Sequence, residues 1–185
     1  VNGFITLAKS RPGELHYASA GFGNITQLAA ELFSSMAGIR LIHVPYKGSG
    51  PAVIDLIAGQ VTVYFPPLPS ALPQVRSGKL KALAVSGSKR SLSAPGIPTI
   101  SESGLPGYEA GSWYGLVAPA RIPRDLIDLL YRACINVIQS SDTQERMKSQ
   151  GLDPVASSPE EFESKVKRDI EKWRKVFAEA SIKME

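Results

Sequence analysis

Short strand-like runs alternate with short helix-like runs through the first half of the chain, and this alternation restricts the possible folds more than any other feature. Apolar runs rich in Val, Leu, Ile, Ala and Tyr predict strands at residues 15–19, 41–46, 61–65 and 81–86. Helical spacing of apolar residues and the turn residues that bound it predict helices at 2–9, 26–37, 51–58 and 69–76. Alternating strands and helices form βαβ units, so we expect an α/β fold whose mainly parallel sheet is flanked by helices.

The second half of the chain has too little strand to form a sheet of its own. Gly, Pro and Ser dominate residues 87–107, which predicts a long connection. The elements expected after it are a strand at 109–118 and helices at 123–139, 142–149 and 159–180. The last helix carries an apolar stripe that predicts a core-facing side: Phe162, Val166, Ile170, Trp173 and Phe177.

These proportions predict two α/β lobes, with the chain crossing between them near Tyr108–Gly111. The single strand of the second half must then join strands supplied elsewhere, most simply by residues before Val1. Residue 1 is Val and not Met, it already lies inside an amphipathic helical pattern, and no basic or apolar leader segment follows it. We therefore expect a processed, truncated or partial chain.

Composition argues against several classes of function. Of 185 residues, one is cysteine and two are histidine, which leaves neither a disulfide framework nor a cysteine-rich or histidine-rich metal site. The net charge of +4 comes from scattered lysines and arginines, so a nucleic-acid groove is not expected. No apolar stretch approaches the roughly 20 residues that span a bilayer. Cys134 is expected to be a small buried apolar residue on its helix.

One turn has the features of an anion site. Residues 19–26 join a predicted strand to a predicted helix, and they read Ser-Ala-Gly-Phe-Gly-Asn-Ile-Thr. The glycines permit close approach of a ligand, and the helix start offers unpaired N–H groups with Asn24 and Thr26 as side-chain partners. A dinucleotide fingerprint would need Gly at the position of Thr26. The alternative is a tight turn whose glycines serve backbone geometry alone.

The remaining motifs favour structural interpretations. Residues 47–51, Lys-Gly-Ser-Gly-Pro, lack the order of a phosphate-binding loop, and a plain connection is favoured there. His16 and His43 lie inside predicted strands, where packed or edge positions are favoured over catalytic bases. Alternation along a strand predicts that one ring of Trp113-Tyr114 faces a cleft and the other the core. The sequence contains no evident nucleophile–base pair and no catalytic constellation.

Four blocks of the sequence resemble the substrate-binding proteins of tripartite tricarboxylate transporters, of the Bug or TctC type. The resemblance covers essentially the whole chain, and HVPYKGSGPA and GLPGYEA are its most specific motifs. The blocks are YASAGFGNITQLAAELF at 17–33, HVPYKGSGPAVIDLIAGQVTVYF at 43–65, LPSALPQVRSGKLKALAV at 68–85 and YEAGSWYGLVAP at 108–119.

The resemblance implies a non-catalytic periplasmic receptor of two lobes that captures a small carboxylate in the cleft between them. Residues 1–109 would be most of the second lobe and 110–185 the returning part of the first, with about a hundred mature residues missing before Val1. It implies a monomer without a cofactor that delivers its ligand to the membrane subunits of the transporter. The implied ligand-binding residues are Ser19, Ala20, Gly21, Gly23, Asn24, Ile25, Thr26, Pro66 and Pro67.

The chain departs from the family pattern beside the expected cleft. Gln27 and Asn24 stand where relatives often carry His and Ser. Pro66-Pro67 stands where Asp-Asn is usual, which removes polar side chains and backbone donors and makes the far end of the pocket more apolar. Dicarboxylates, tricarboxylates, acidic amino acids and aromatic acids all remain possible ligands, with a slight preference for an apolar distal part.

Two other functions are compatible with the same residues. A small α/β enzyme acting on a carboxylated substrate would use the helix terminus as an anion hole. A ligand-sensing domain would feed a signalling partner instead of a transporter. Turnover of a bound carboxylate would indicate the enzyme, and a neighbouring gene for a sensor kinase would indicate the sensor.

Overall fold

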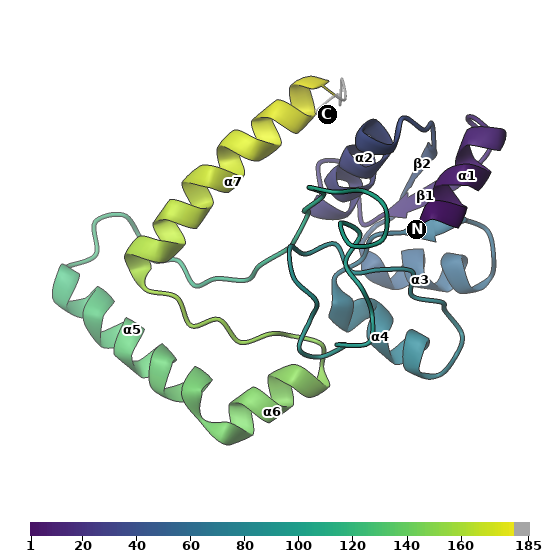
Figure 1. Ribbon diagram of the computed structural model, residues 1–185. Coiled ribbons are helices and arrows are strands. Elements are labelled where there is room, and N and C mark those ends of the chain that lie inside the picture. The colour runs from purple at the N-terminus through teal and green to yellow at the C-terminus, as the bar shows by residue number, and fades with distance from the viewer. Residues whose placement is uncertain (180–185) are drawn as a thin grey trace.

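The computed structural model describes residues 1–179 and contains seven helices and three short strands in that range (Figure 1). The strands are β1 (His16–Ser19), β2 (Ile42–Pro45) and β3 (Val63–Tyr64). The helices are α1 (Asn2–Ser10), α2 (Ile25–Ala37), α3 (Ser49–Ile57), α4 (Leu68–Arg76), α5 (Arg124–Gln139), α6 (Ser141–Ser149) and α7 (Pro159–Glu179). Every predicted helix is confirmed with small shifts at its ends, although residue 180 of the last one lies outside the described residues.

The three strands form one parallel sheet in the order β2-β1-β3. Helix α2 connects β1 to β2, and α3 connects β2 to β3, so both connections are the βαβ units that the sequence predicts. In the register, Tyr17 of β1 lies between His43 of β2 and Val63 of β3. The α/β fold with a parallel sheet is therefore confirmed.

The core lies on both faces of this sheet. On one face, α1 and α2 pack with residues 100–110, and Phe33 and Tyr108 are the largest buried side chains there. On the other face, Ala52 and Val53 of α3 pack on Ala18 of β1 and Tyr64 of β3. The central strand β1 is thus covered on both sides, which explains why three successive residues of it, Tyr17, Ala18 and Ser19, are buried.

Two predicted strands are wrong. Residues 81–86 form no strand, and only Val85 makes an isolated parallel bridge, to Thr99. Residues 109–118 likewise form no strand; among the described residues, their only backbone bond to a distant segment runs from the Ala110 N–H to the Ser86 carbonyl, at 2.8 Å. A strand exists only where a neighbouring strand pairs with its backbone, and apolar composition cannot supply that neighbour.

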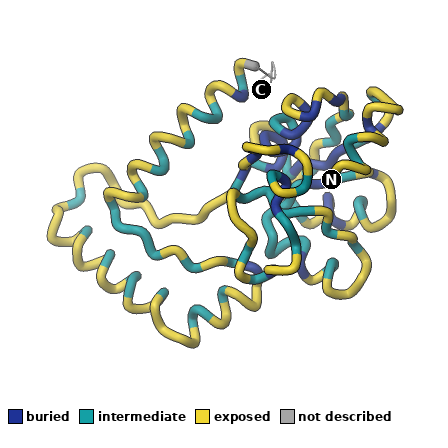
Figure 2. Tube along the Cα trace, viewed as in Figure 1, coloured by how far each residue is buried: buried dark blue, intermediate teal, exposed yellow. Residues whose placement is uncertain are grey.

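Beyond residue 111 the chain leaves the α/β body along an irregular segment that leads to α5 and α6, and a second irregular segment leads from α6 to α7 (Figures 1 and 2). The apolar stripe of α7 is less buried than expected, because only the C-terminal half of this helix packs on the core. Trp173 contacts the core beside α2 and Val176 is buried, whereas Ile170 is 52% exposed. The apolar stripe of α5 contains no buried residue.

None of the helices within residues 1–179 is both long enough and apolar enough to cross a bilayer.

Candidate ligand-binding site

The carboxyl ends of the three parallel strands meet at one edge of the sheet, and a turn follows each of them. From β1 the chain goes outward to β2 and then returns to β3 on the other side of β1. Such a reversal leaves a crevice at the carboxyl ends of the strands, where open α/β sheets bind their ligands. A cavity of about 360 Å³ lies there, lined by Ala20, Asn24, Ile25, Thr26, Gly48, Ser49, Pro67, Ser112, Trp113 and Tyr114.

The turn from β1 to α2 forms the first wall of this cavity. Gly23 has a φ of +67°, in the left-handed region that glycine adopts without strain. Asn24 caps α2, because its Oδ1 accepts hydrogen bonds from the N–H and the hydroxyl of Thr26, both at 3.1 Å. The Thr26 hydroxyl oxygen in turn accepts from the Ala20 N–H at 2.8 Å. The side chains of Asn24 and Thr26 therefore hold the turn in shape.

Most backbone donors of this turn are already paired within it. The Gly21 N–H donates to Ser19 Oγ at 3.2 Å, and the Gly23 N–H donates to Gln27 Oε1 at 2.8 Å. In the part of the chain that the structure describes, the Ile25 N–H has no hydrogen-bond partner. Because Ile25 lines the cavity at the first position of α2, its N–H is a donor that a ligand can use.

A Ser–His pair lies beneath the turn, and sequence reasoning missed it. Ser19 Oγ is 2.6 Å from His43 Nε2, and Ser19 is completely buried. The His43 ring stacks on Tyr17 with 4.8 Å between ring centroids, and burial lowers the pKa of His43. The two residues are on neighbouring strands, so only their parallel pairing brings them together.

The amide of Gln27 determines which nitrogen of His43 carries the proton. Gln27 Oε1 accepts from the Gly23 N–H, which turns Gln27 Nε2 toward His43 Nδ1 at 3.4 Å. An amide nitrogen can only donate, so Nδ1 accepts and Nε2 donates its hydrogen to Ser19 Oγ. In this tautomer His43 donates to Ser19 and does not accept a proton from it. His43 is thus a packed histidine, as predicted.

The turn from β2 to α3 forms the second wall, although the sequence favoured a plain connection there. Gly48 and Ser49 both line the cavity, and Gly48 has a φ of +105°. No side chain caps α3, and among the described residues the N–H groups of Ser49 and Gly50 have no hydrogen-bond partner. The Tyr64 hydroxyl donates to Ser49 Oγ at 3.0 Å, which leaves the Ser49 hydroxyl hydrogen for another acceptor. The sequence feature that could have predicted this wall is that both turns follow predicted neighbouring strands of a parallel sheet, whose carboxyl ends lie at the same edge.

The third wall of the cavity combines a proline and two aromatic rings with the hydroxyls of Ser112 and Tyr114. Pro67 follows β3, and the segment at 112–114 contributes Ser112, Trp113 and Tyr114. Trp113 also contacts α7, with its Nε1–H donating to Asp169 at 2.6 Å and its ring packed edge-on against Phe162. Tyr114 is 74% exposed. Both rings thus line the cavity, whereas strand alternation predicted that only one would face it.

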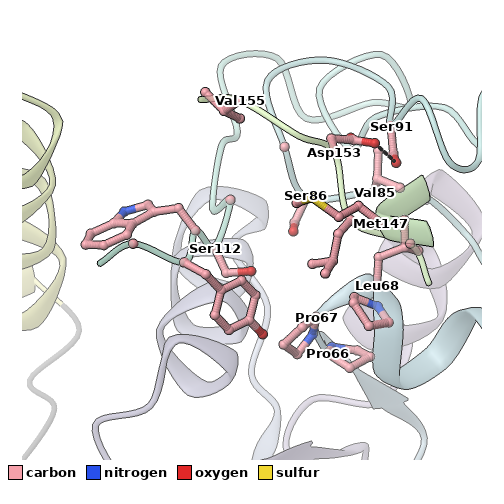
Figure 3. Close-up of a pocket in the computed structure, with 18 of the residues that line it drawn as sticks. Pro66, Pro67, Leu68, Val85, Ser86, Ser91, Ser112, Met147, Asp153 and Val155 are labelled. Carbon is pink, nitrogen blue, oxygen red and sulfur yellow. Dashed lines mark hydrogen bonds between the residues drawn. The ribbon is translucent and has the colours of Figure 1, made fainter. Parts of the chain in front are cut away.

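A second, much larger cavity of about 1780 Å³ adjoins the first and shares Pro67, Ser112, Trp113 and Tyr114 with it. Its volume exceeds the roughly 300–1,000 Å³ typical of small-molecule pockets. Pro66, Leu68 and Met147 line it close to Pro67 (Figure 3). Cys134 also lines it and is half-buried, so the prediction of a buried cysteine is wrong.

The structure brings five of the nine predicted binding residues to the 360 Å³ cavity: Ala20, Asn24, Ile25, Thr26 and Pro67. Ser19, Gly21 and Gly23 support the turn and are not among the residues that line this cavity. Pro66 lines the larger cavity. Within residues 1–179, no cluster of three or more His, Cys, Asp or Glu side chains is placed to hold a metal ion.

Comparison with known proteins agrees with this arrangement. The sequence model of the tripartite tricarboxylate transporter family receptor matches residues 1–182. Protein BugT of Bordetella pertussis is 35% identical over 184 residues, which is 100% of this chain and 56% of BugT. A UPF0065 protein from the tcbD-tcbE intergenic region of Pseudomonas sp. is 35% identical over 95% of this chain and 52% of its own length. The chain thus spans about half the length of these relatives.

Solved structures match over the same extent. Rpa4515 of R. palustris with adipate has a TM-score of 0.91 and 34% identity, covering 98% of this chain and 61% of that chain. MatC of Rhodopseudomonas palustris with bound malate has a TM-score of 0.83 and 31% identity, and the match covers 95% of this chain and 61% of MatC. The periplasmic binding protein BugD has a TM-score of 0.83 and 30% identity, and the match covers 100% of this chain and 62% of BugD. The chain therefore has the fold of periplasmic binding proteins and belongs to the TctC family of tripartite tricarboxylate transporter receptors.

Proposed function

We propose that the protein is a periplasmic solute receptor that binds a small carboxylate at the 360 Å³ cavity and delivers it to the membrane subunits of a tripartite transporter. The observation that carries this proposal is the convergence of two helix starts on one cavity, each with an N–H group that has no partner within residues 1–179. Helix starts favour anions, since their free N–H groups and dipoles both point toward the ligand. Two structural neighbours have adipate and malate bound.

We assign the carboxylate to donors from both turns. The Ile25 N–H comes from α2, and the Ser49 N–H and hydroxyl come from α3. Asn24 and Thr26 shape the first turn, and Ser19 supports it from below. Hydrogen bonds to a charged group contribute about 1.5–3 kcal/mol each, so these few donors suffice to distinguish an acid from its amide.

The complete receptor would have two lobes that close on the ligand. Residues 1–109 would form most of one lobe and residues 110–185 part of the other, with the crossover near 108–111. The position of Ser112, Trp113 and Tyr114 on the cavity opposite the strand-end turns supports this division. Closure would bury the carboxylate and present one surface to the transporter, with the receptor acting as a monomer.

The donor that most specifically tests the proposal is the Ile25 N–H. Ile25→Pro removes this hydrogen at the first position of α2, where helices accept proline, and Asn24 already has the extended backbone that precedes a proline. Ile25→Ala is the matched control, because it shortens the same side chain and keeps the N–H. Both variants belong in the full reading frame that contains this chain.

The measurement begins with a thermal-shift screen of small carboxylic acids and their amides. An acid that raises Tm while its amide does not would identify a ligand. Ile25→Pro should then bind that acid at least about tenfold more weakly than Ile25→Ala, as expected for one charge-assisted hydrogen bond. Equal affinities for the two variants would contradict the assigned donor, and stabilisation by amides as well as acids would contradict a carboxylate receptor.

A further inference from the structure

The Tyr64 hydroxyl lies behind the second wall of the 360 Å³ cavity and contacts a residue that lines it. Tyr64 is the last residue of β3, and its buried side chain belongs to the core cluster that contains Ala18 and Val53. Its hydroxyl donates to Ser49 Oγ at 3.0 Å. Ser49 is the first residue of α3 and lines the cavity, whereas Tyr64 is not among the described residues that line it. Tyr64 can therefore influence a ligand in this cavity through Ser49.

The surroundings of Tyr64 keep its hydroxyl a hydrogen-bond donor. Burial raises the pKa of Tyr64, and this effect exceeds the opposite effect of the Ser49 and Thr26 hydroxyls. The phenol thus retains its hydrogen at neutral pH. The Thr26 hydroxyl already accepts from the Ala20 N–H and donates to Asn24, whereas Ser49 Oγ receives the Tyr64 hydrogen.

The hydrogen bond from Tyr64 determines what the Ser49 hydroxyl can do. A serine hydroxyl has a single hydrogen, and near a helix start it can bond to backbone groups of its own turn. Tyr64 occupies one acceptor site of Ser49 Oγ and holds this oxygen from a buried ring. Within residues 1–179 the Ser49 hydroxyl donates to no acceptor, so its hydrogen remains for a ligand in the cavity. A hydroxyl that accepts a hydrogen bond is also polarised and becomes a stronger donor.

We propose that Tyr64 is a positioning residue, which orients and polarises the Ser49 hydroxyl so that this hydroxyl donates to the carboxylate of the ligand. The inference rests on the proposed function, which assigns the Ser49 hydroxyl to the carboxylate. It adds a core residue that does not line the cavity to the residues that determine affinity. If Tyr64 acts through Ser49, its effect on affinity must disappear when the Ser49 hydroxyl is removed.

A double-mutant cycle in the full reading frame tests this dependence. The probe is whichever of adipate, malate, hexanoate and benzoate binds the parent most tightly in calorimetry. Tyr64→Phe should bind the probe at least about fivefold more weakly than the parent, and Ser49→Ala at least about tenfold more weakly. In the Ser49→Ala background, Tyr64→Phe should change the Kd by less than about twofold.

Tyr108→Phe is the matched control, because it also removes a buried hydroxyl. The Tyr108 hydroxyl donates to the Ala29 carbonyl at 2.9 Å, and neither residue is among those that line the cavity. This variant should lose stability in urea unfolding but keep the affinity of the parent. A second measurement needs no substitution. In NMR of the parent with isotope-labelled tyrosine rings, the probe should shift the Tyr64 signal more than the Tyr108 signal.

The outcomes separate failure of the inference from failure of the proposed function. Unchanged affinity of Tyr64→Phe, an equal loss in the parent and in the Ser49→Ala background, or equal NMR shifts would overturn the inference. Binding of an acid would still support a carboxylate receptor in these cases. If none of the four acids binds the parent, or if benzamide binds as well as benzoate, then the proposed function falls and the inference falls with it.

Discussion

Ser19 Oγ and His43 Nε2 lie 2.6 Å apart at the buried carboxyl end of β1. The pair has the spacing of a nucleophile and its base, yet the hydrogen runs from the histidine to the serine. Gln27 sets this direction by donating to the opposite ring nitrogen. The Ser19 hydroxyl oxygen also accepts from the Gly21 N–H and donates to the Gly21 carbonyl, both at 3.2 Å. Its bonds thus connect β1 and β2 to the turn that precedes α2.

Removal of the Ser19 hydroxyl should therefore destabilise the protein. Ser19→Ala leaves the His43 and Gly21 donors without their acceptor in a buried site, which typically costs about 1–3 kcal/mol. Urea unfolding of the full reading frame measures this loss. Ser10→Ala is the control, since the Ser10 hydroxyl is exposed and bonds only to the Leu7 carbonyl. Equal stability of the two variants would mean that the Ser19 network contributes little.

Stability should fall as the pH drops below the ordinary histidine pKa of 6.5. Burial lowers the pKa of His43 in the folded protein, so the unfolded chain takes up a proton that the folded one resists. Protonation of His43 Nδ1 would also place its N–H group against the amide N–H of Gln27, so that two donors would face each other. Tyr17 is a titratable group that stacks on His43, and its hydroxyl donates a hydrogen bond to Glu31. Burial, followed by this carboxylate, raises the Tyr17 pKa far above its usual value.

The His43 contribution can be isolated by comparing pH profiles. The free energy of unfolding is measured at pH 7.5, 6.5 and 5.5 for the parent and for His43→Phe, which retains an aromatic ring on Tyr17. The parent should lose more stability over this range, with a limiting slope of about 1.4 kcal/mol per pH unit for one proton. Parallel profiles would show that His43 titrates alike in the folded and unfolded states.

Asn24 should act mainly as a helix cap. Asn24→Ala removes the acceptor of the Thr26 N–H and hydroxyl, and loss of such a cap costs about 0.5–2 kcal/mol. Asn24→Asp retains an acceptor and should restore most of the stability. The control Asn136→Ala, at an exposed position inside α5, should be neutral or slightly stabilising. If Asn24→Asp is as unstable as Asn24→Ala, loss of the helix cap does not explain the loss of stability in Asn24→Ala.

Gly115→Ala should destabilise the protein, because a Cβ at this position would overlap the ring of Phe162 on α7. The ring must move to make room; overpacking of a core typically costs about 1–3 kcal/mol, and the lower end of that range is expected at this exposed glycine. Gly96→Ala is the control, since a Cβ there meets nothing within 4 Å. Combining Gly115→Ala with Phe162→Ala in a double-mutant cycle should relieve the clash. Purely additive losses would contradict this contact.

Sequence alone determined the helices, the three paired strands and the turn between β1 and α2. These features depend on local physics: apolar spacing sets the buried face of a helix, Asn24 caps α2 through its own side chain, and glycine permits a left-handed backbone at residue 23. The loss of backbone donors at Pro66 and Pro67 could also be predicted from the sequence, since proline lacks an N–H in any fold.

Only the tertiary structure decided which residues meet. The Ser19–His43 pair joins positions 24 apart, and Ser49 shares a cavity with Asn24 because β1 and β2 are parallel neighbours. The same dependence on partners explains the missed elements. Residues 81–86 and 109–118 have strand-like composition, yet no strand pairs with them among the described residues. Backbone pairing between distant segments is a property of the folded chain, and local composition does not contain it.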